Sequence, residues 1–247
     1  MSSSTYVDSG VNAEPMLTML PRNWQGDGTV PGVIFSHGFG GTALECRQPD
    51  LPMLSLMLML QQAVLDLGIP VVSGNFGGNH WGNPASTTKI TAAVDYLANT
   101  LGAKAGRVGL VGQSMGHLGA MNWVAQNLSK TMFVVSSIGV ADLANINQQA
   151  AYTASITAAY GAAYTDAAFG ATSNPSINTA AKYAGLKWLG FAGTDDAVCP
   201  IARTTALKTA IGSTATLVPM PGGHTWEAMA GVDIPTMRDF IDLNGRA

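Results

Sequence analysis

The residues of this chain best suited to chemistry are one serine, two adjacent aspartates and a histidine near the C-terminus. Ser114 lies within Gly-Gln-Ser-Met-Gly at 112–116, and Asp195, Asp196 and His224 follow it in the chain. A serine hydroxyl is a poor nucleophile until an imidazole accepts its proton and a carboxylate orients that imidazole. The sequence therefore offers the three groups that attack on a carbonyl carbon requires, in the order serine, acid, histidine.

The segment around Ser114 predicts a strand that turns sharply into a helix. A strand-like run at 107–111 precedes the serine, and an apolar stretch at 118–124 follows it. Side chains two residues on either side of a serine at such a turn would collide, and Gly112 and Gly116 relieve that crowding. A Gly-x-Ser-x-Gly pentapeptide recurs by chance in many chains, but here the flanking segments also match a nucleophile elbow.

Further apolar runs predict strands that alternate with helices, which favours a largely parallel sheet. The strand expected at 33–36 opens into a glycine-rich loop at 37–41. Helical periodicity covers 87–101. The expected strands lie at 5–11, 15–20, 33–36, 69–72, 107–111, 132–140 and 187–192.

In motif order and spacing, from about Val33 to the C-terminus, the chain resembles the α/β-hydrolase superfamily. Within that superfamily it resembles serine esterases and lipases, including the cutinase-like polyester hydrolases and the dienelactone-hydrolase-like enzymes. The resemblance implies a mostly parallel central sheet with flanking helices. The length of 247 residues fits one such domain over 1–247. The resemblance also implies that Ser114 is the nucleophile and His224 the general base, while His37, His80 and His117 compete with His224 for that role.

The acid of the triad is less sharply defined than the serine, because three aspartates follow strands. The spacing of Asp196 from Gly193 and Pro200 matches the family pattern Gly-x-x-Asp-x-x-x-Pro, so Asp196 is the first choice. Asp195 is the next candidate, and Asp142 occupies a place that some related enzymes use. The aspartates left over are expected to stabilise turns or helix starts.

Two backbone N–H groups are expected to form an oxyanion hole for the negative charge that develops during acyl transfer. Met115 follows the nucleophile, and Phe39 follows His37-Gly38, where the family places its second donor. Two positions depart from the family pattern without touching the triad. Asn75 stands where many relatives have Asp, and His117 stands where a third glycine often follows the elbow.

A segment at 142–185, rich in Ala, Tyr, Thr and Asn, is longer than an ordinary connection and predicts a cap insertion. Tyr152, Ile156, Tyr160 and Tyr164 recur every fourth residue. This spacing places them on one helical face that either packs on the core or lines the substrate pocket. From this face Tyr160 and Tyr164 are the candidates for substrate contact. Trp81, in an unusual loop that also contains Phe76, and Trp226, next to His224, are further candidates for a pocket wall.

Composition excludes several other classes of function. Charged residues make up 11 % of the chain, against roughly 25 % in an average soluble protein. The net charge is −3 without a Lys/Arg cluster, which argues against nucleic-acid binding. No phosphate-binding glycine motif or metal-ligand spacing is present, so neither a cofactor nor a metal is expected.

The two cysteines, Cys46 and Cys199, are expected to be free and buried, with one disulfide between them as the alternative.

The most apolar stretch, at 51–67, contains polar residues and is shorter than a bilayer-spanning helix. It predicts a core helix covered on several sides, with an interfacial membrane helix as the lesser alternative. The N-terminus has no visible secretory signal, so the default expectation is a cytoplasmic location, with a secreted or virion-associated location left open.

These expectations combine into a serine carboxylic-ester hydrolase that acts through an acyl-enzyme on a hydrophobic ester, from a small molecule to a lipid or polyester. The same triad also serves thioesterases, amidases and peptidases on this fold. The alternative is a protein that is not an enzyme: a non-catalytic domain with a hydrolase-like fold that serves as a scaffold in a larger assembly.

Overall fold

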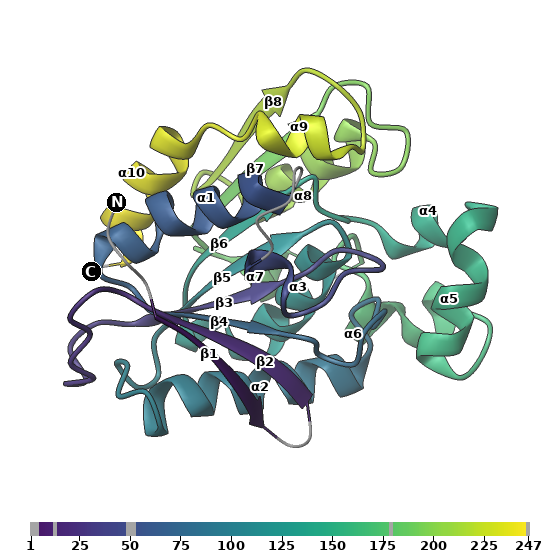
Figure 1. The fold of residues 1–247 in the computed structure, drawn as a ribbon. Coiled ribbons are helices and arrows are strands. Elements are labelled where there is room, and N and C mark those ends of the chain that lie inside the picture. Colours follow the sequence, from purple (N-terminus) through teal and green to yellow (C-terminus); the bar gives the residue numbers. More distant parts are fainter. Residues whose placement is uncertain (1–4, 12–13, 48–52, 178–179, 246–247) are drawn as a thin grey trace.

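The computed structural model describes residues 5–11, 14–47, 53–177 and 180–245. Its centre is one eight-stranded sheet with the order β1-β2-β4-β3-β5-β6-β7-β8 (Figure 1). The pairings β1–β2 and β2–β4 are antiparallel and all others are parallel, so β2 alone runs against the other strands. The strands are β1 (Thr5–Val11), β2 (Glu14–Leu20), β3 (Gly32–Ser36), β4 (Val71–Gly74), β5 (Val108–Gln113), β6 (Thr131–Ser137), β7 (Trp188–Gly193) and β8 (Ala215–Met220).

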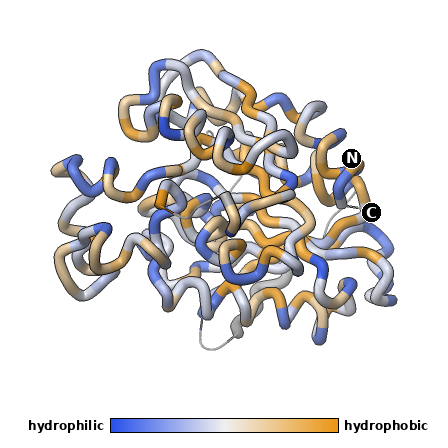
Figure 2. Tube along the Cα trace, turned by 180° about the vertical axis from the view of Figure 1, so that it is seen from behind, coloured by the Kyte–Doolittle hydropathy of each residue, from blue (hydrophilic) through white to orange (hydrophobic). Residues whose placement is uncertain are grey.

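Helices cover both faces of the sheet, as the alternation of strands and helices predicted. The main helices are α1 (Met53–Ala63), α2 (Pro84–Asn99), α3 (Met115–Asn127), α4 (Leu143–Asn147), α5 (Ala150–Tyr160), α6 (Ala171–Ser173), α7 (Ala180–Tyr183), α8 (Ile201–Ile211), α9 (Trp226–Ala230) and α10 (Ile234–Gly245). Residues of α1, α9 and α10 form one apolar cluster with the sheet, and residues of α2, α3 and α8 form another on the opposite face. Figure 2 shows the hydrophobic residues gathered in the middle of the molecule, where the strands run.

The central strands are apolar throughout because both of their faces are covered. Every residue of β3, β5 and β7 is buried. Strands buried on both faces lack the polar–apolar alternation of a half-exposed sheet. This burial fixes the ends of β3, β5 and β7, and the loops that follow them, in one rigid frame.

The structure corrects the sequence-based prediction at two boundaries and adds one strand. The strand expected at 132–140 ends at Ser137, because Ile138 has a φ of 43° and the chain leaves the sheet there. An eighth strand, β8, was not expected. The helix expected at 51–67 is α1 followed by a short 3-10 turn at Leu65–Leu67, and residues 51–52 lie outside the described residues. Only one side of α1 is fully buried, through Leu56, Met59, Leu60 and Ala63.

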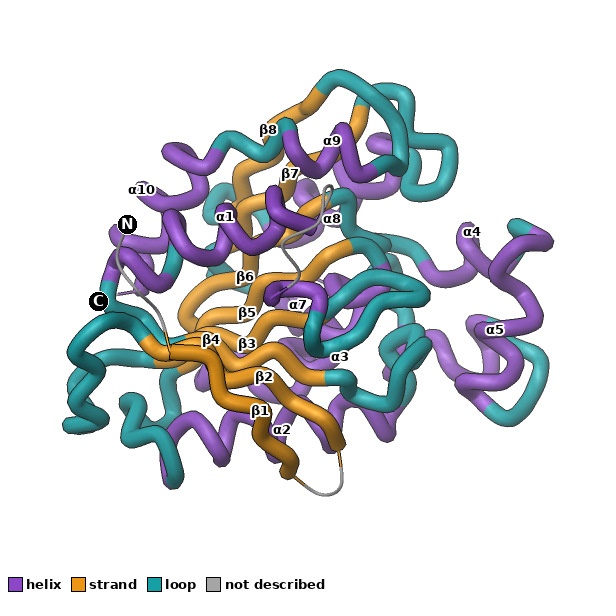
Figure 3. The backbone as a smooth tube through the Cα atoms, viewed as in Figure 1, coloured by secondary structure: helices purple, strands orange, loops and turns teal. Residues whose placement is uncertain are grey.

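The chain between β6 and β7 carries the helices α4 to α7. Figure 3 shows α4 and α5 standing apart from the sheet, beyond the ends of the central strands. A third apolar cluster joins them to the rest of the molecule and includes Trp81, Met115, Ile146 and Ile156. In the described part of the chain, no helix combines the length and hydrophobicity needed to cross a bilayer.

Candidate active site

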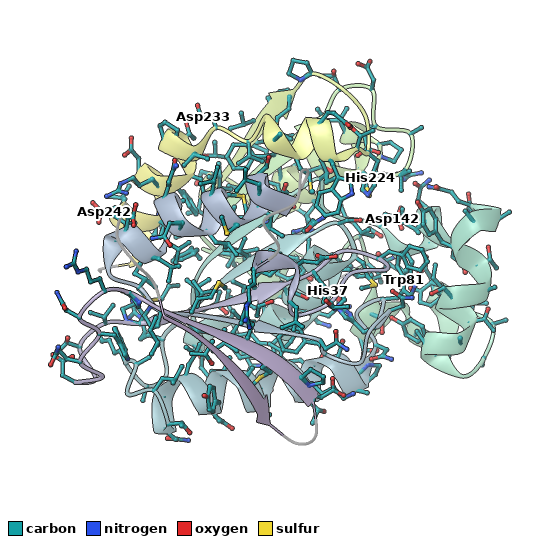
Figure 4. All side chains as sticks on the ribbon, in the orientation of Figure 1. His37, Trp81, Asp142, His224, Asp233 and Asp242 are labelled. Carbon is teal, nitrogen blue, oxygen red and sulfur yellow. The ribbon has the colours of Figure 1, made fainter. Side chains whose placement is uncertain are left out.

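Four loops meet beyond the carboxyl ends of parallel strands, the edge at which open α/β sheets bind their ligands. They follow β3, β5, β7 and β8 and carry Phe39, Ser114, Asp196 and His224, respectively. Figure 4 shows His37, Trp81 and His224 on the same side of the molecule, between the sheet and the α4–α5 region. Residues that are far apart in the sequence therefore converge at one edge.

Ser114 occupies the turn between β5 and α3 in a strained conformation, with φ 46° and ψ −116°. The two glycines of the pentapeptide are required by close packing. A Cβ atom on Gly112 would lie 2.4 Å from the Cα atom of His117, and one on Gly116 would lie 2.0 Å from the carbonyl oxygen of Ser36. The Ser114 N–H donates to the carbonyl of Ser137 at 3.0 Å, and the Val140 N–H donates to the carbonyl of Ser114 at 3.1 Å. Both backbone groups of the serine are thus held by the chain that leaves β6.

A continuous line of hydrogen bonds connects the serine, the histidine and an aspartate. The Ser114 Oγ lies 2.8 Å from His224 Nε2. On the other side of the ring, His224 Nδ1 lies 2.8 Å from Asp196 Oδ2. Because a carboxylate oxygen accepts, the proton of the neutral ring is placed on Nδ1, which leaves Nε2 free to accept the hydroxyl proton of Ser114. Ser114 and Asp196 are 8 % and 5 % exposed, so the line is largely shielded from solvent.

Asp196 is the aspartate that the fold brings to His224. Its Oδ1 accepts hydrogen bonds from the backbone N–H groups of Val198 at 2.8 Å and Cys199 at 2.7 Å, which fixes the carboxylate while Oδ2 faces the imidazole. Asp195 is exposed, and its Oδ2 accepts from the hydroxyl of Thr194.

Asp142, the third candidate acid, accepts from the N–H groups of Ala144 and Asn145 and so caps the start of α4. It therefore has the structural role expected for a leftover aspartate.

The three competing histidines are buried and bonded elsewhere. The His37 ring lies against the carbonyl oxygens of Gly38 and Asn75, at 2.7 and 3.1 Å. The His80 ring accepts from the Gly82 N–H at 2.9 Å, and burial lowers the pKa of His80 to about 3.

His117 donates from Nδ1 to the carbonyl of Val140 at 3.0 Å and accepts from the indole N–H of Trp188 at 3.1 Å. Burial lowers the pKa of His117 to about 4. A neutral His117 therefore ties α3 to β7 and to the loop after β6, and both of its ring nitrogens are used in doing so.

The two expected oxyanion donors lie beside Ser114. Met115 is the first residue of α3, so its N–H has no partner within the helix. Among the hydrogen bonds of the described residues, none uses the N–H of Phe39 or that of Met115 as donor. The Met115 side chain is fully buried, whereas Phe39 is 42 % exposed and lines the cavity at the serine.

A cavity of about 130 Å³ opens at Ser114 and His224. Three of its aromatic residues contact one another: the ring centroids of Phe39, Trp81 and Tyr152 are 5.3 to 5.4 Å apart. Trp226 lines the cavity as well. The complete lining is Gly38, Phe39, Trp81, Gln113, Ser114, Ile138, Val140, Ile146, Tyr152, Val198, His224, Thr225, Trp226 and Met229.

Two of the expected substrate contacts do not line this cavity. The Tyr160 hydroxyl donates to the carbonyl of Trp81 at 2.9 Å, and the Tyr164 hydroxyl donates to Asp166 at 2.9 Å. Both tyrosines belong to the third apolar cluster instead. Tyr160 is the last residue of α5, and Gly161 ends the helix with a φ of 69°, so Tyr164 lies beyond the expected helical face. Tyr152, the first aromatic residue of the same stripe, reaches the cavity instead. Tyr152 lies about two helical turns before Tyr160, closer in the chain to β6 and the sheet, and this position was the available signal.

One group of potential metal ligands occurs in the described part of the chain. Asp196, Cys199 and His224 place their ligand atoms within 4.8 Å of one another. Burial, followed by the charge of Asp196, raises the pKa of the Cys199 thiol. Because a metal binds the thiolate, this environment disfavours a metal there. Cys46 and Cys199 are both free and buried, as the simpler expectation held.

The fold of this chain, but not its sequence, matches known proteins. Neither a protein-family model nor a curated protein sequence matches the chain. Among solved structures it is similar to FphF, a fluorophosphonate-binding serine hydrolase of Staphylococcus aureus, with a TM-score of 0.75 and 14 % identity over 97 % of this chain and 98 % of that one. It is also similar to a mutant of the esterase rPPE, with a TM-score of 0.69 and 16 % identity over 100 % and 84 %. Est1E from Butyrivibrio proteoclasticus gives 0.65 and 17 % over 97 % and 98 %.

The chain therefore has the α/β-hydrolase fold: a mostly parallel sheet with helices on both faces and a serine at the turn after the central strand β5. At this level of identity the likeness establishes the fold, and the chemistry depends on the residues of the chain itself.

Proposed function

We propose that this protein is a serine hydrolase that cleaves carboxylic esters through an acyl-enzyme on Ser114. The observation that supports it most is the line of two 2.8 Å hydrogen bonds from Ser114 Oγ through the His224 ring to Asp196 Oδ2. This is the arrangement that converts a hydroxyl into a nucleophile. The strained turn at Ser114 supports the same reading, because it presents the hydroxyl of a nucleophile elbow to a cavity.

Acylation begins when Ser114 Oγ attacks the ester carbonyl carbon and His224 Nε2 takes the hydroxyl proton. The carbonyl oxygen becomes an oxyanion, which accepts hydrogen bonds from the N–H groups of Phe39 and Met115. His224 then returns the proton to the leaving alkoxide, so the alcohol departs and the acyl group stays on Ser114. Asp196 holds the charged imidazole throughout.

Deacylation repeats these steps with water in place of serine. His224 takes a proton from the water, the hydroxide oxygen bonds to the acyl carbon, and Ser114 Oγ leaves with the proton that His224 returns. The products are the carboxylic acid and free enzyme, and none of these steps requires a metal or an organic cofactor.

The lining of the cavity supports a hydrophobic acyl ester as the substrate. Aromatic and aliphatic side chains surround the serine, and the chain offers few charges anywhere. The insertion at 142–185 supplies Tyr152 and Ile146 to this wall, which supports its role as a small cap. Small-molecule esters, lipids and polyesters all fit this description, and thioesters, amides and peptides react by the same steps.

A fluorophosphonate probe combined with p-nitrophenyl esters of increasing chain length tests the proposal. We expect covalent labelling of Ser114 and ester turnover, both lost in Ser114→Ala. Ser136→Ala is the matched control, since Ser136 is also buried on an adjacent strand but lies outside the hydrogen-bonded line. Absence of both labelling and turnover in the folded wild-type protein would refute the proposal and favour the scaffold without catalysis.

A further inference from the structure

A small side pocket lies next to the cavity at Ser114, on the sheet face covered by α1. Gln113 and Met229 line both spaces, so the side pocket begins where the main cavity ends. It measures about 10 Å³, which is room for a single water-sized group. Its remaining lining is Phe35, Ser55, Leu56, Met59, Val111, Gly112 and Ser137.

Two polar side chains line the side pocket at the carboxyl ends of β5 and β6. Gln113 and Ser137 are register partners on β5 and β6, so their side chains point to the same face. One register step earlier on that face, the partners are Val111 and Val135, which belong to the apolar cluster under α1 and α10. Among these register partners of β5 and β6, the face is polar only at its carboxyl end, beside the serine.

Both polar side chains are buried and present an atom without a partner. Gln113 is 6 % exposed and Ser137 is 3 % exposed. Within the described residues, neither Gln113 Oε1 nor Ser137 Oγ has a hydrogen-bond partner. A buried polar group without a partner destabilises the folded protein, so such groups in a native structure call for a ligand that pairs with them.

We infer that this side pocket binds a hydroxyl group on the acyl part of the substrate, which makes short hydroxyacyl esters the preferred class. A hydroxyl group has the size of the pocket and the required hydrogen-bonding pattern. It donates its proton to Gln113 Oε1 and accepts one from the Ser137 hydroxyl. An unsubstituted acyl chain satisfies neither atom. The inference rests on the proposed ester hydrolysis and adds the chemical class of the acid.

Gln113 precedes the nucleophile in the chain, which puts the side pocket within reach of an acyl group on Ser114. The apolar part of the lining, from Leu56, Met59 and Met229, suits the carbon atoms that carry the hydroxyl. Sites built to bond a substrate hydroxyl discriminate against analogues without it, because their own polar groups are then left unpaired.

The test compares ethyl butanoate with its 2-hydroxy and 3-hydroxy derivatives, each as separate enantiomers, with hydrolysis followed by pH-stat titration. Rates are divided by those of hydroxide-catalysed hydrolysis to remove differences in intrinsic reactivity. We expect kcat/KM for at least one hydroxy ester to exceed that for ethyl butanoate by about tenfold, the contribution of a pair of hydrogen bonds. Equal corrected rates for all esters would overturn the inference and leave only an ordered water in the pocket.

Single substitutions in the side pocket test whether Gln113 and Ser137 cause the preference for hydroxy esters. Ser137→Ala should bring the ratio of hydroxy to plain ester close to one, and so should Gln113→Met, which keeps the length of the side chain. Ser136→Ala is the matched control. Ser136 Oγ is also buried and has no partner among the described residues. It faces away from the side pocket, because Ser136 and Ser137 are neighbours on a strand and point to opposite sides of the sheet. Its ratio should equal that of the wild type. A ratio that survives in both Ser137→Ala and Gln113→Met would overturn the assignment of the pocket.

These outcomes separate the inference from the proposed function. The ratio is internal to each variant, so a general loss of turnover next to Ser114 does not mimic a loss of preference. Fluorophosphonate labelling of Ser114 with equal corrected rates for all esters would remove the hydroxyacyl preference and retain the hydrolase. Absence of labelling and of turnover would remove both.

Discussion

Replacing Glu45 by Gln should stabilise the protein above neutral pH and change its stability little in acid. Glu45 lies after the glycine-rich loop at 37–41 and is 6 % exposed. The N–H of Thr42 donates to its carboxylate, but Oε2 has no partner among the described residues. Burial raises the pKa of Glu45 from 4.5 to about 7. The fold therefore favours the neutral acid and opposes its ionised form.

The sign and size follow from linkage between protonation and folding. Between pH 4.5 and about 7 the unfolded chain has lost this proton while the folded protein keeps it, so the stabilising effect of the neutral group is complete below pH 4.5 and disappears as the pH rises through about 7. With about 1.4 kcal/mol per pKa unit, ionisation of Glu45 costs the folded state on the order of 3 kcal/mol above pH 7. A glutamine at this position is neutral at every pH and avoids that cost.

The assay is urea denaturation of the wild type and of Glu45→Gln at several pH values between 4 and 8.5. The difference in free energy of unfolding between variant and wild type should grow in favour of the variant by about 3 kcal/mol over this range. Asp239→Asn is the control, because Asp239 is an exposed carboxylate on α10. A difference that stays constant with pH would show that Glu45 does not titrate near neutrality, and the reasoning from burial would be wrong.

Two further predictions concern the site and the turn that presents the serine. Asp196→Asn should lower kcat for p-nitrophenyl esters by about 10³- to 10⁴-fold, because the amide no longer fixes the imidazole tautomer. Asp195→Asn should keep a kcat near that of the wild type. The reverse ranking of the two variants would assign the acid to Asp195. Gly116→Ala should lower the free energy of unfolding, measured in urea, by about 1–3 kcal/mol, because the new Cβ atom would lie 2.0 Å from the carbonyl oxygen of Ser36. Gly223→Ala should change it little, because a Cβ atom there has no neighbour closer than 3.4 Å. Equal stability of the two glycine variants would contradict the packing described at the elbow.

Local sequence patterns predicted the centre of the fold well, because they reflect burial and sterics within a few residues. The strand, the turn and the helix around Ser114 follow from an apolar run, two glycines and a second apolar run. The fold class, confirmed by the sheet and by the structural comparisons, follows from the same alternation. The eighth strand was missed because β8 lies at the edge of the sheet, contains Pro219 and is only partly buried, so it lacks the apolar signal of a central strand.

Side-chain convergence could not be read from the sequence, since it depends on packing between distant elements. The adjacent residues Asp195 and Asp196 have the same local propensities. The family spacing favoured Asp196, but the turn after β7 is what brings its carboxylate to His224. The tyrosine spacing predicted one continuous helical face, but α5 ends at Tyr160, so Tyr164 lies beyond the helix and only Tyr152 reaches the cavity. The pairing of Gln113 with Ser137 follows from the register of β5 and β6, which no motif records.

The backbone clamp on Ser114 separates the placement of the nucleophile from the shape of the pocket. The chain leaving β6 holds both the N–H and the carbonyl of Ser114, whereas Tyr152 and Trp226 reach the pocket from α5 and α9. Libraries randomised at Tyr152 and Trp226 can therefore change substrate selectivity while Ser114 Oγ keeps its position. This makes the molecule a convenient starting point for directed evolution.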